Sequence, residues 1–131
     1  MTDLQNHLIY VVDNNDRDCG MLKEIMDDYR MSCRLRFFGN GAELFIQLTH
    51  RLDGRLPDMI LMDLDMPIMN GFDTLRLLKA IEEYRRVPVV VRTTLNEDEV
   101  INRCYDLGCQ AYVVKTVYSK HLVNVMQLCL N

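Results

Sequence analysis

Short apolar segments alternate along the chain with longer segments of helical period. Three of the short segments are almost continuous in Val, Ile, Leu and Met, which is typical of strands covered on both faces of a sheet. Another segment, CRLRFF, alternates polar with apolar positions and predicts an edge strand. The predicted strands are 8–13, 33–38, 58–63, 87–94 and 111–115.

Between these strands, apolar residues recur at every third or fourth position, so each intervening segment predicts an amphipathic helix. Asp16 is placed to cap the first helix and Asn96 the fourth. Five strand–helix units predict a doubly wound α/β domain, with a parallel sheet and helices on both of its faces. The predicted helices are 17–30, 41–50, 71–84, 97–107 and 120–130.

Composition limits the function without changing this fold. With 131 residues, 49% of them hydrophobic, the chain suits one domain over 1–131. The net charge is −4 and no block of Lys and Arg is present, so we expect no nucleic-acid partner. No secretory signal or membrane span is evident, which favours a cytoplasmic protein. The chain ends after the last predicted helix, so we expect no output domain.

Polar residues close four of the five predicted strands. Ligands bind at the carboxyl ends of the strands in such folds, so we expect these residues to share a site. Clustered carboxylates suit Mg²⁺, and a carboxylate can also act as a nucleophile that forms an aspartyl phosphate. A Lys would neutralise phosphoryl oxygens and a Thr hydroxyl would hydrogen-bond to one of them. The residues are Asp13, Asp63 with Asp65, Thr93 and Lys115.

The stretches VVDNN, ILMDLDMPIMNG, PVVVRTT and YVVK, in this order and spacing, resemble a response-regulator receiver domain of two-component signalling. The resemblance covers nearly the whole chain. It implies a flavodoxin-like (βα)5 fold with strand order 2-1-3-4-5. It also implies a stand-alone, non-enzymatic signalling protein, phosphorylated by a sensor histidine kinase or a histidine phosphotransfer protein.

The resemblance also implies roles for individual residues. Asp63 is the expected phosphoacceptor. Asp13, Asp63 and the backbone carbonyl of Asp65 are expected to bind Mg²⁺, while Thr93 and Tyr112 are the expected switch residues and Lys115 contacts the phosphoryl group. The downstream protein partner, or a second copy in a homodimer, would bind the face formed by helix four, strand five and helix five.

Two positions depart from the family pattern. Asn14 stands where a second acidic residue is usual, so it keeps a carbonyl ligand but lacks a charge, and we expect weaker metal binding. Asp16 either compensates for this loss or only caps its helix. Thr116 follows Lys115 where proline is usual, and a cis bond there would cost about 3 kcal/mol, so we expect a trans peptide.

Other functions remain open at this level. Asn14 and Thr116 also suit a binding module that works without phosphate. The Asp63–Asp65 pair resembles the catalytic pair of haloacid-dehalogenase-like phosphatases, although that pair normally follows the first strand. An FMN-binding flavodoxin is disfavoured because the turn DNNDRD is acidic. The side chain of Asp65 is either solvated or influences hydrolysis, and Arg92, inside an apolar strand, either reaches a carboxylate or lines a partner surface.

Overall fold

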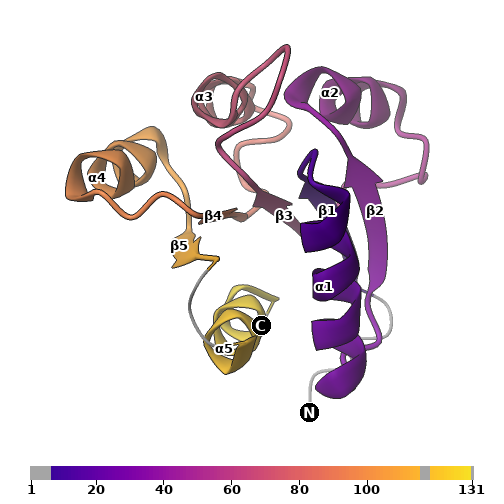
Figure 1. Ribbon diagram of the computed structural model, residues 1–131. Coiled ribbons are helices and arrows are strands. Elements are labelled where there is room, and N and C mark those ends of the chain that lie inside the picture. Colours follow the sequence, from indigo (N-terminus) through magenta and orange to yellow (C-terminus); the bar gives the residue numbers. More distant parts are fainter. Residues whose placement is uncertain (1–6, 116–118, 131) are drawn as a thin grey trace.

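The computed structural model describes residues 7–115 and 119–130. Over these residues five strands and five helices alternate, and the strands form one parallel sheet in the order β2-β1-β3-β4-β5 (Figure 1). The predicted fold and strand order are therefore confirmed. The elements are β1 (Leu8–Val12), α1 (Asp16–Asp28), β2 (Arg34–Phe38), α2 (Gly41–His50), β3 (Met59–Met62), α3 (Gly71–Ala80), β4 (Val89–Thr93), α4 (Asp98–Leu107), β5 (Ala111–Val114) and α5 (Ser119–Leu130).

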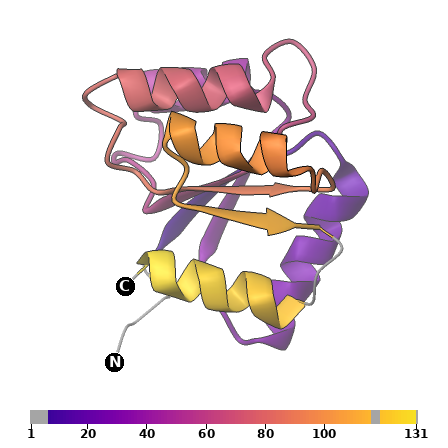
Figure 2. The same ribbon diagram turned by 90° about the vertical axis from the view of Figure 1, so that its left-hand side faces the viewer.

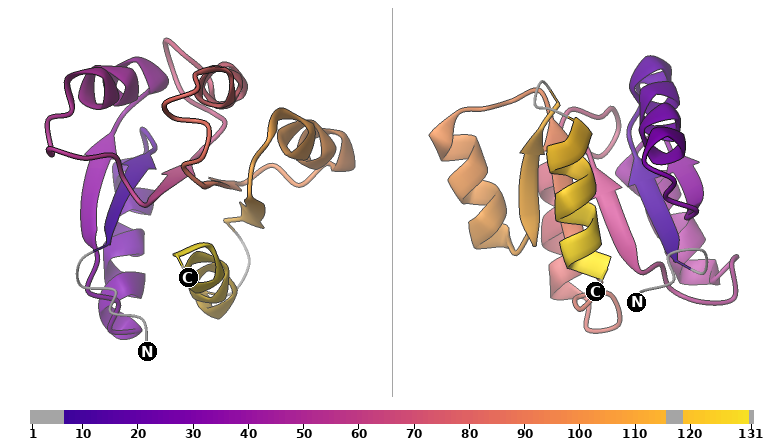
Figure 3. Two further views of the ribbon diagram at one scale, coloured as in Figure 1. Left: turned by 180° about the vertical axis from the view of Figure 1, so that it is seen from behind. Right: turned by 90° about the horizontal axis from the view of Figure 1, so that it is seen from below.

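The helices cover both faces of the sheet. In Figure 1, α1 and α5 lie on one face and α2, α3 and α4 on the other, and Figures 2 and 3 show the same layers from the side, from behind and from below. Alternate residues of a strand point to opposite faces, so β1 supplies Tyr10 to one core and Ile9 to the other. Because both faces are buried, the central strands read as continuous apolar runs.

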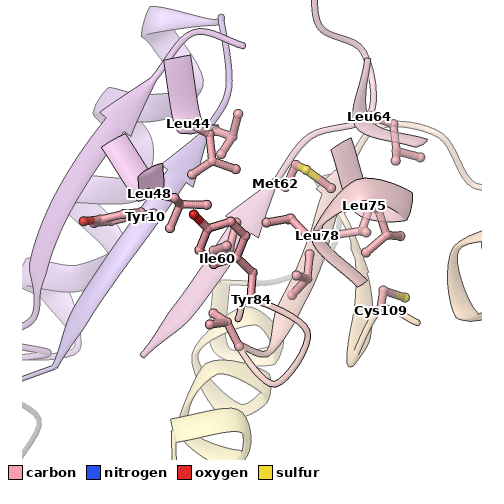
Figure 4. Close-up of a cluster of buried hydrophobic side chains, with 14 of the residues drawn as sticks. Tyr10, Leu44, Leu48, Ile60, Met62, Leu64, Leu75, Leu78, Tyr84 and Cys109 are labelled. Atoms are coloured by element: carbon pink, nitrogen blue, oxygen red, sulfur yellow. The ribbon is translucent and has the colours of Figure 1, made fainter. Parts of the chain in front are cut away.

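The larger core lies between the sheet and α2, α3 and α4 (Figure 4). Leu44 and Leu48 of α2 and Leu75 and Leu78 of α3 are at most 1% exposed. Their spacing of three or four residues puts them on one side of each helix, where they meet the strands. At about 25 cal/mol per Å² of buried apolar surface, burial of this kind is the main force that stabilises the sheet sandwich.

The third helix is shorter than predicted. It ends at Ala80, and Ile81 has an extended backbone, with φ −88° and ψ 117°. The apolar pattern continues to Tyr84 because this side chain folds back into the core, where it is 6% exposed. Lys79 Nζ donates to the carbonyls of Arg85 and Val87, at 2.9 Å each, and so holds the turn after the helix.

Two predicted caps are wrong. Asn15, not Asp16, caps α1, since its side-chain oxygen accepts a hydrogen bond from the Asp18 amide at 3.0 Å. Asp16 becomes the first helical residue instead. At α4 the N-cap is Glu97, without a side-chain cap bond, so Asn96 lies one residue too early to take that role. Asparagines do cap α2 and α3, where their side-chain oxygens accept hydrogen bonds from backbone amides of the first turn.

Candidate functional site

Three residues of the candidate site, Asp13, Asp63 and Lys115, each lie one position after the end of a strand. The amide of Asp13 donates to the Phe38 carbonyl and that of Asp63 to the Val12 carbonyl, at 2.9 Å each. Val12 and Met62 are register partners in β1 and β3, so the two acids that follow them lie side by side. The amide of Lys115 likewise donates to the carbonyl of Thr93 at 2.7 Å. Parallel pairing therefore brings these residues to one edge of the sheet.

Lys115 is the centre of the site. Its ammonium donates to Asp13 Oδ2 at 2.9 Å, Asp18 Oδ2 at 2.7 Å and Asp63 Oδ2 at 2.8 Å. The Lys115 side chain is only 7% exposed. Burial would lower the pKa of Lys115, but the bonds to Asp18, Asp63 and Asp13 outweigh it and the pKa is raised. Lys115 is therefore a fixed cation, and we call these four residues the Lys115 cluster.

The main chain orients both strand-end acids. Asp63 Oδ1 accepts from the amides of Leu64 at 2.7 Å and Asp65 at 3.3 Å, while Asp13 Oδ1 accepts from the Asn15 amide at 2.9 Å. In each carboxylate, one oxygen thus accepts hydrogen bonds from the backbone and the other accepts one from Lys115. The side chains of Asp63 and Asp13 are 9% and 4% exposed, so burial and hydrogen bonding together restrict them to this orientation.

Gly71 supports the loop that carries Asp63. Its amide donates to the Leu64 carbonyl at 3.0 Å. A Cβ atom at this position would lie 2.5 Å from Leu64 Cα and 2.7 Å from the Asp63 carbonyl oxygen, both backbone atoms that cannot move aside. Only glycine therefore lets the start of α3 pack this closely against the end of β3.

Asp18 was not predicted as a site residue. It lies in the first turn of α1 and reaches Lys115 with a side chain that is 24% exposed. The only signal in the sequence is that α1 starts directly after β1, which puts its first turn at the carboxyl edge of the sheet. Helical acids near an N-terminus usually serve the helix dipole, so the residue type alone does not point to a site.

The Thr93 hydroxyl is buried without a partner. The residue is 1% exposed, and Oγ1 makes no hydrogen bond within the described part of the chain. Leaving such a group unpaired costs about 1–3 kcal/mol, so each case needs an explanation. Thr93 pairs through its carbonyl with the Lys115 amide, so this unpaired hydroxyl belongs to a residue adjoining the cluster and is available to a ligand oxygen.

Tyr112 connects the end of β4 to β5. Its hydroxyl donates to the Leu95 carbonyl, two residues after Thr93, at 2.8 Å. The ring packs against the larger core, and burial raises the pKa of Tyr112 to about 12. The hydroxyl is therefore a neutral donor at ordinary pH. Its expected change of rotamer stays a prediction.

The remaining predicted residues lie at the margin of the site. Asn14, Asp16 and the side chain of Asp65 are exposed, and none of the three contacts the Lys115 ammonium. Arg92 is 7% exposed and lines a cavity of about 90 Å³ between α1, β5 and α5, without an ion pair to any described carboxylate. Thr116, with its expected trans peptide, lies outside the described residues.

The donor set suits a divalent cation. With all four groups ionised, three carboxylates and one ammonium give the Lys115 cluster a formal charge of −2 (three negative, one positive). Carboxylate and carbonyl oxygens are the ligands that Mg²⁺ prefers. Over residues 7–115 and 119–130, no three His, Cys, Asp or Glu side chains form a ready metal site. Lys115 engages one carboxylate oxygen each of Asp13 and Asp63.

Residues 9–127 match the family described as Response regulator receiver domain. The chain belongs to this family. A match of 30% identity over 133 residues to Response regulator Rcp1 of Synechocystis covers 97% of this chain and 90% of that protein. A match of 38% identity over 63 residues to Two-component response regulator ORR1 of rice covers 48% of this chain and 27% of that protein. The match therefore spans about a quarter of the rice relative.

Solved receiver structures have the same fold. A putative response regulator from Chloroflexus aurantiacus has a TM-score of 0.83 at 19% identity, covering 95% of this chain and 97% of that one. The Mn²⁺-bound form of Rcp1 has a TM-score of 0.78 at 22% identity, covering 95% and 90%.

The chain is thus a receiver domain of two-component signal transduction. Receiver domains are phosphoacceptor signalling proteins and not enzymes in the ordinary sense, which confirms the prediction of a non-enzymatic domain. In the part of the receiver that the structure describes, no helix is long and apolar enough to cross a bilayer.

Proposed function

We propose that Asp63 accepts a phosphoryl group from a phosphohistidine of a sensor histidine kinase or a phosphotransfer protein. The observation that carries this proposal is the arrangement around Asp63: its Oδ2 lies 2.8 Å from a fixed ammonium, in a cluster that also holds Asp13. A buried carboxylate is a competent nucleophile for phosphoryl transfer. The receiver family supplies the expected donor.

In this reaction a carboxylate oxygen of Asp63 attacks phosphorus. The new O–P bond forms as the N–P bond of the phosphohistidine breaks, and the departing imidazole nitrogen takes up a proton. Lys115 balances charge on the phosphoryl oxygens, and the unpaired hydroxyl of Thr93 donates to one of them. Catalysis consists mainly of positioning and charge stabilisation, as in other phosphoryl transfers.

The cofactor we propose is Mg²⁺, held by Asp13, Asp63 and the backbone carbonyl of Asp65, with Asn14 as a weak additional ligand. The charge of −2 on the Lys115 cluster supports this choice. The Mn²⁺-bound form of Rcp1 also supports a divalent ion. When bound, such an ion would supply positive charge that stabilises the phosphoryl oxygens during transfer. Asn14 lacks a charge, so we expect a weaker site than two adjacent acids would make.

We further propose that residues 1–131 act as one receiver unit that signals by binding another protein. The proposed surface is formed by α4, β5 and α5, and a downstream partner or a second copy would bind there. The Tyr112–Leu95 bond supports this route because it ties the segment after Thr93 to β5. A shift of Thr93 toward a phosphoryl oxygen would thereby change the population of conformations at this surface.

The test is incubation with acetyl phosphate and Mg²⁺, followed by intact-mass analysis. We expect one added phosphoryl group in the wild type and none in Asp63→Asn. Asp73→Asn is the matched control, because Asp73 is an exposed acid of α3 that pairs only with Arg76 among the described residues. Chelation of Mg²⁺ should block the modification. Failure of the wild type at every Mg²⁺ concentration would favour the phosphate-independent binding module.

A further inference from the structure

We infer that Asp18 is a positioning residue that holds Lys115 at the phosphoacceptor site throughout phosphoryl transfer. This inference rests on the proposed function, because the role it assigns belongs to that reaction. Of the three carboxylates on the ammonium, Asp18 makes the shortest contact, at 2.7 Å. It is also the only one that comes from a helix rather than from the end of a strand.

Asp18 is itself held rigidly. Its backbone amide donates to the Asn15 side chain at 3.0 Å, which is the cap of α1. Its carboxylate projects from the same helix as Leu22 and Met26, which are buried against the sheet at 0% and 3% exposure. An acid mounted on a capped and packed helix offers a fixed acceptor to the flexible four-carbon chain of Lys115.

The other two acids have competing duties. In the proposed reaction Asp63 gives an oxygen to phosphorus and Asp13 serves the divalent ion, so both change their bonding during transfer. Both also use their second oxygen on the main chain. Asp18 neither accepts the phosphoryl group nor binds the ion in the proposed reaction. It is therefore the partner that can keep Lys115 in place while the charges around Asp63 are rearranged.

Geometry also separates Asp18 from its neighbour Asp16. Both acids lie in the first turn of α1, and both complement the helix dipole. Asp16 is exposed and makes no bond to Lys115. Asp18, in contrast, accepts a hydrogen bond from Lys115, which lies 97 residues away in the sequence. A comparison of the two therefore separates a specific contact from the general effect of negative charge.

The test compares Asp18→Asn with Asp16→Asn, which removes the same charge two residues away in the same helical turn. We expect Asp18→Asn to slow phosphorylation by acetyl phosphate about tenfold, because the lost contact is a charge-assisted hydrogen bond. We expect less than about a twofold change for Asp16→Asn, since an exposed charge is screened. Equal slowing in the two variants would overturn the inference in favour of a general field effect.

A double-mutant cycle with Lys115→Met shows whether Asp18 acts through Lys115. We expect Asp18→Asn to change the phosphorylation rate less than about twofold in the Lys115→Met background, because the residue that Asp18 positions is gone. An effect of the same size in both backgrounds would mean that Asp18 acts directly on the ion or the phosphoryl group, and would overturn the positioning role.

Nuclear magnetic resonance of the Lys115 ammonium gives a readout independent of reaction rate. In the metal-free wild type its protons should exchange slowly with water, and they should stay protected after addition of beryllofluoride and Mg²⁺. Asp18→Asn should lose this protection, and Asp16→Asn should keep it. Unchanged protection in Asp18→Asn would refute the inference alone, whereas a wild type that never accepts a phosphoryl group would refute the proposed function and this role with it.

Discussion

Two groups of buried charged residues lie at different places in this receiver, and the residue at the centre of each has the opposite charge. In the Lys115 cluster one cation meets three carboxylates. In the second group, which we call the Asp53 cluster, one carboxylate meets several donors: Asp53 accepts from Tyr10, Arg34, Arg36 and Gln47. The Asp53 side chain is 2% exposed, whereas its two arginines are about half exposed.

The difference distinguishes a structural cluster from a functional one. Asp53 has all of its lone pairs engaged and fastens the loop after α2 to β1 and to the edge strand β2. Burial alone would raise the pKa of Asp53, but the bonds from Tyr10 and Arg36 outweigh it and the pKa is lowered. The Lys115 cluster instead keeps excess negative charge beside an unpaired hydroxyl, so only this cluster is suited to bind something further.

The largest expected effect is that of Lys115→Met. This variant leaves three carboxylates without their cation, so the free energy of unfolding should fall by about 3 kcal/mol. Urea denaturation with and without Mg²⁺ measures it, and Mg²⁺ should restore part of the loss. Lys23→Met is the control, since the exposed Lys23 has its one interaction within the described residues with the Phe37 ring, and its loss should cost less than about 1 kcal/mol. Equal losses would mean that the cluster has no excess charge to balance.

Next in size is Asp53→Asn, for which we expect a loss of about 2 kcal/mol in the free energy of unfolding. The reason is that the buried Tyr10 hydroxyl and two arginines lose their charged acceptor. Phosphorylation by acetyl phosphate should be unchanged, because no partner of Asp53 belongs to the Lys115 cluster. A matching loss of phosphorylation would remove the distinction between the two clusters.

The stabilising effect of Asp53 should also depend on pH. Its folded-state pKa is lowered from the ordinary value of 3.8, so its contribution is present above pH 3.8 and is lost as the pH falls through the lower folded value. The difference in stability between wild type and Asp53→Asn should therefore be constant near neutral pH and shrink in acid. A difference that grows on acidification would have the wrong sign.

A smaller effect is expected for Asn14→Asp. A second acid beside Asp13 should tighten Mg²⁺ binding about tenfold, because Mg²⁺ is a hard cation that prefers charged oxygen ligands. Titration calorimetry measures the dissociation constant. The same change at Asn15, which caps α1, is the control and should leave Mg²⁺ affinity almost unaltered. Equal tightening by both variants would indicate a general charge effect and no ligand role at position 14.

The smallest effect on stability is expected for Thr93→Val. This change keeps the shape of the side chain but removes an unpaired buried hydroxyl, so stability should stay the same or rise by about 0.5–1 kcal/mol. Thermal unfolding measures it. At the same time, the phosphorylated variant should lose the conformational response around Tyr112. A clear loss of stability would mean that Thr93 has a structural partner after all.

Much of the fold could be predicted because both faces of the sheet are buried. Continuous apolar strands and one-sided helices leave few other arrangements, and the alternating pattern of CRLRFF correctly indicated the edge strand. Helix ends were less predictable. After α3 ends, the apolar period continues through Ile81 to Tyr84, which reaches the core from a turn. Periodicity alone does not distinguish a buried turn residue from a further helical residue.

The residues that close the strands can be read from the sequence, and parallel strands end together, so Asp13, Asp63, Thr93 and Lys115 could be assigned to one edge without a structure. Which side chains touch depends on tertiary packing and could not be read in this way. It brought Asp18 to Lys115, left Asp16 in solvent and left the Thr93 hydroxyl unpaired. These outcomes depend on how α1 packs on the sheet beside the end of β5. The Lys115–Asp18 bond joins residues 97 positions apart, so local sequence patterns do not reveal it.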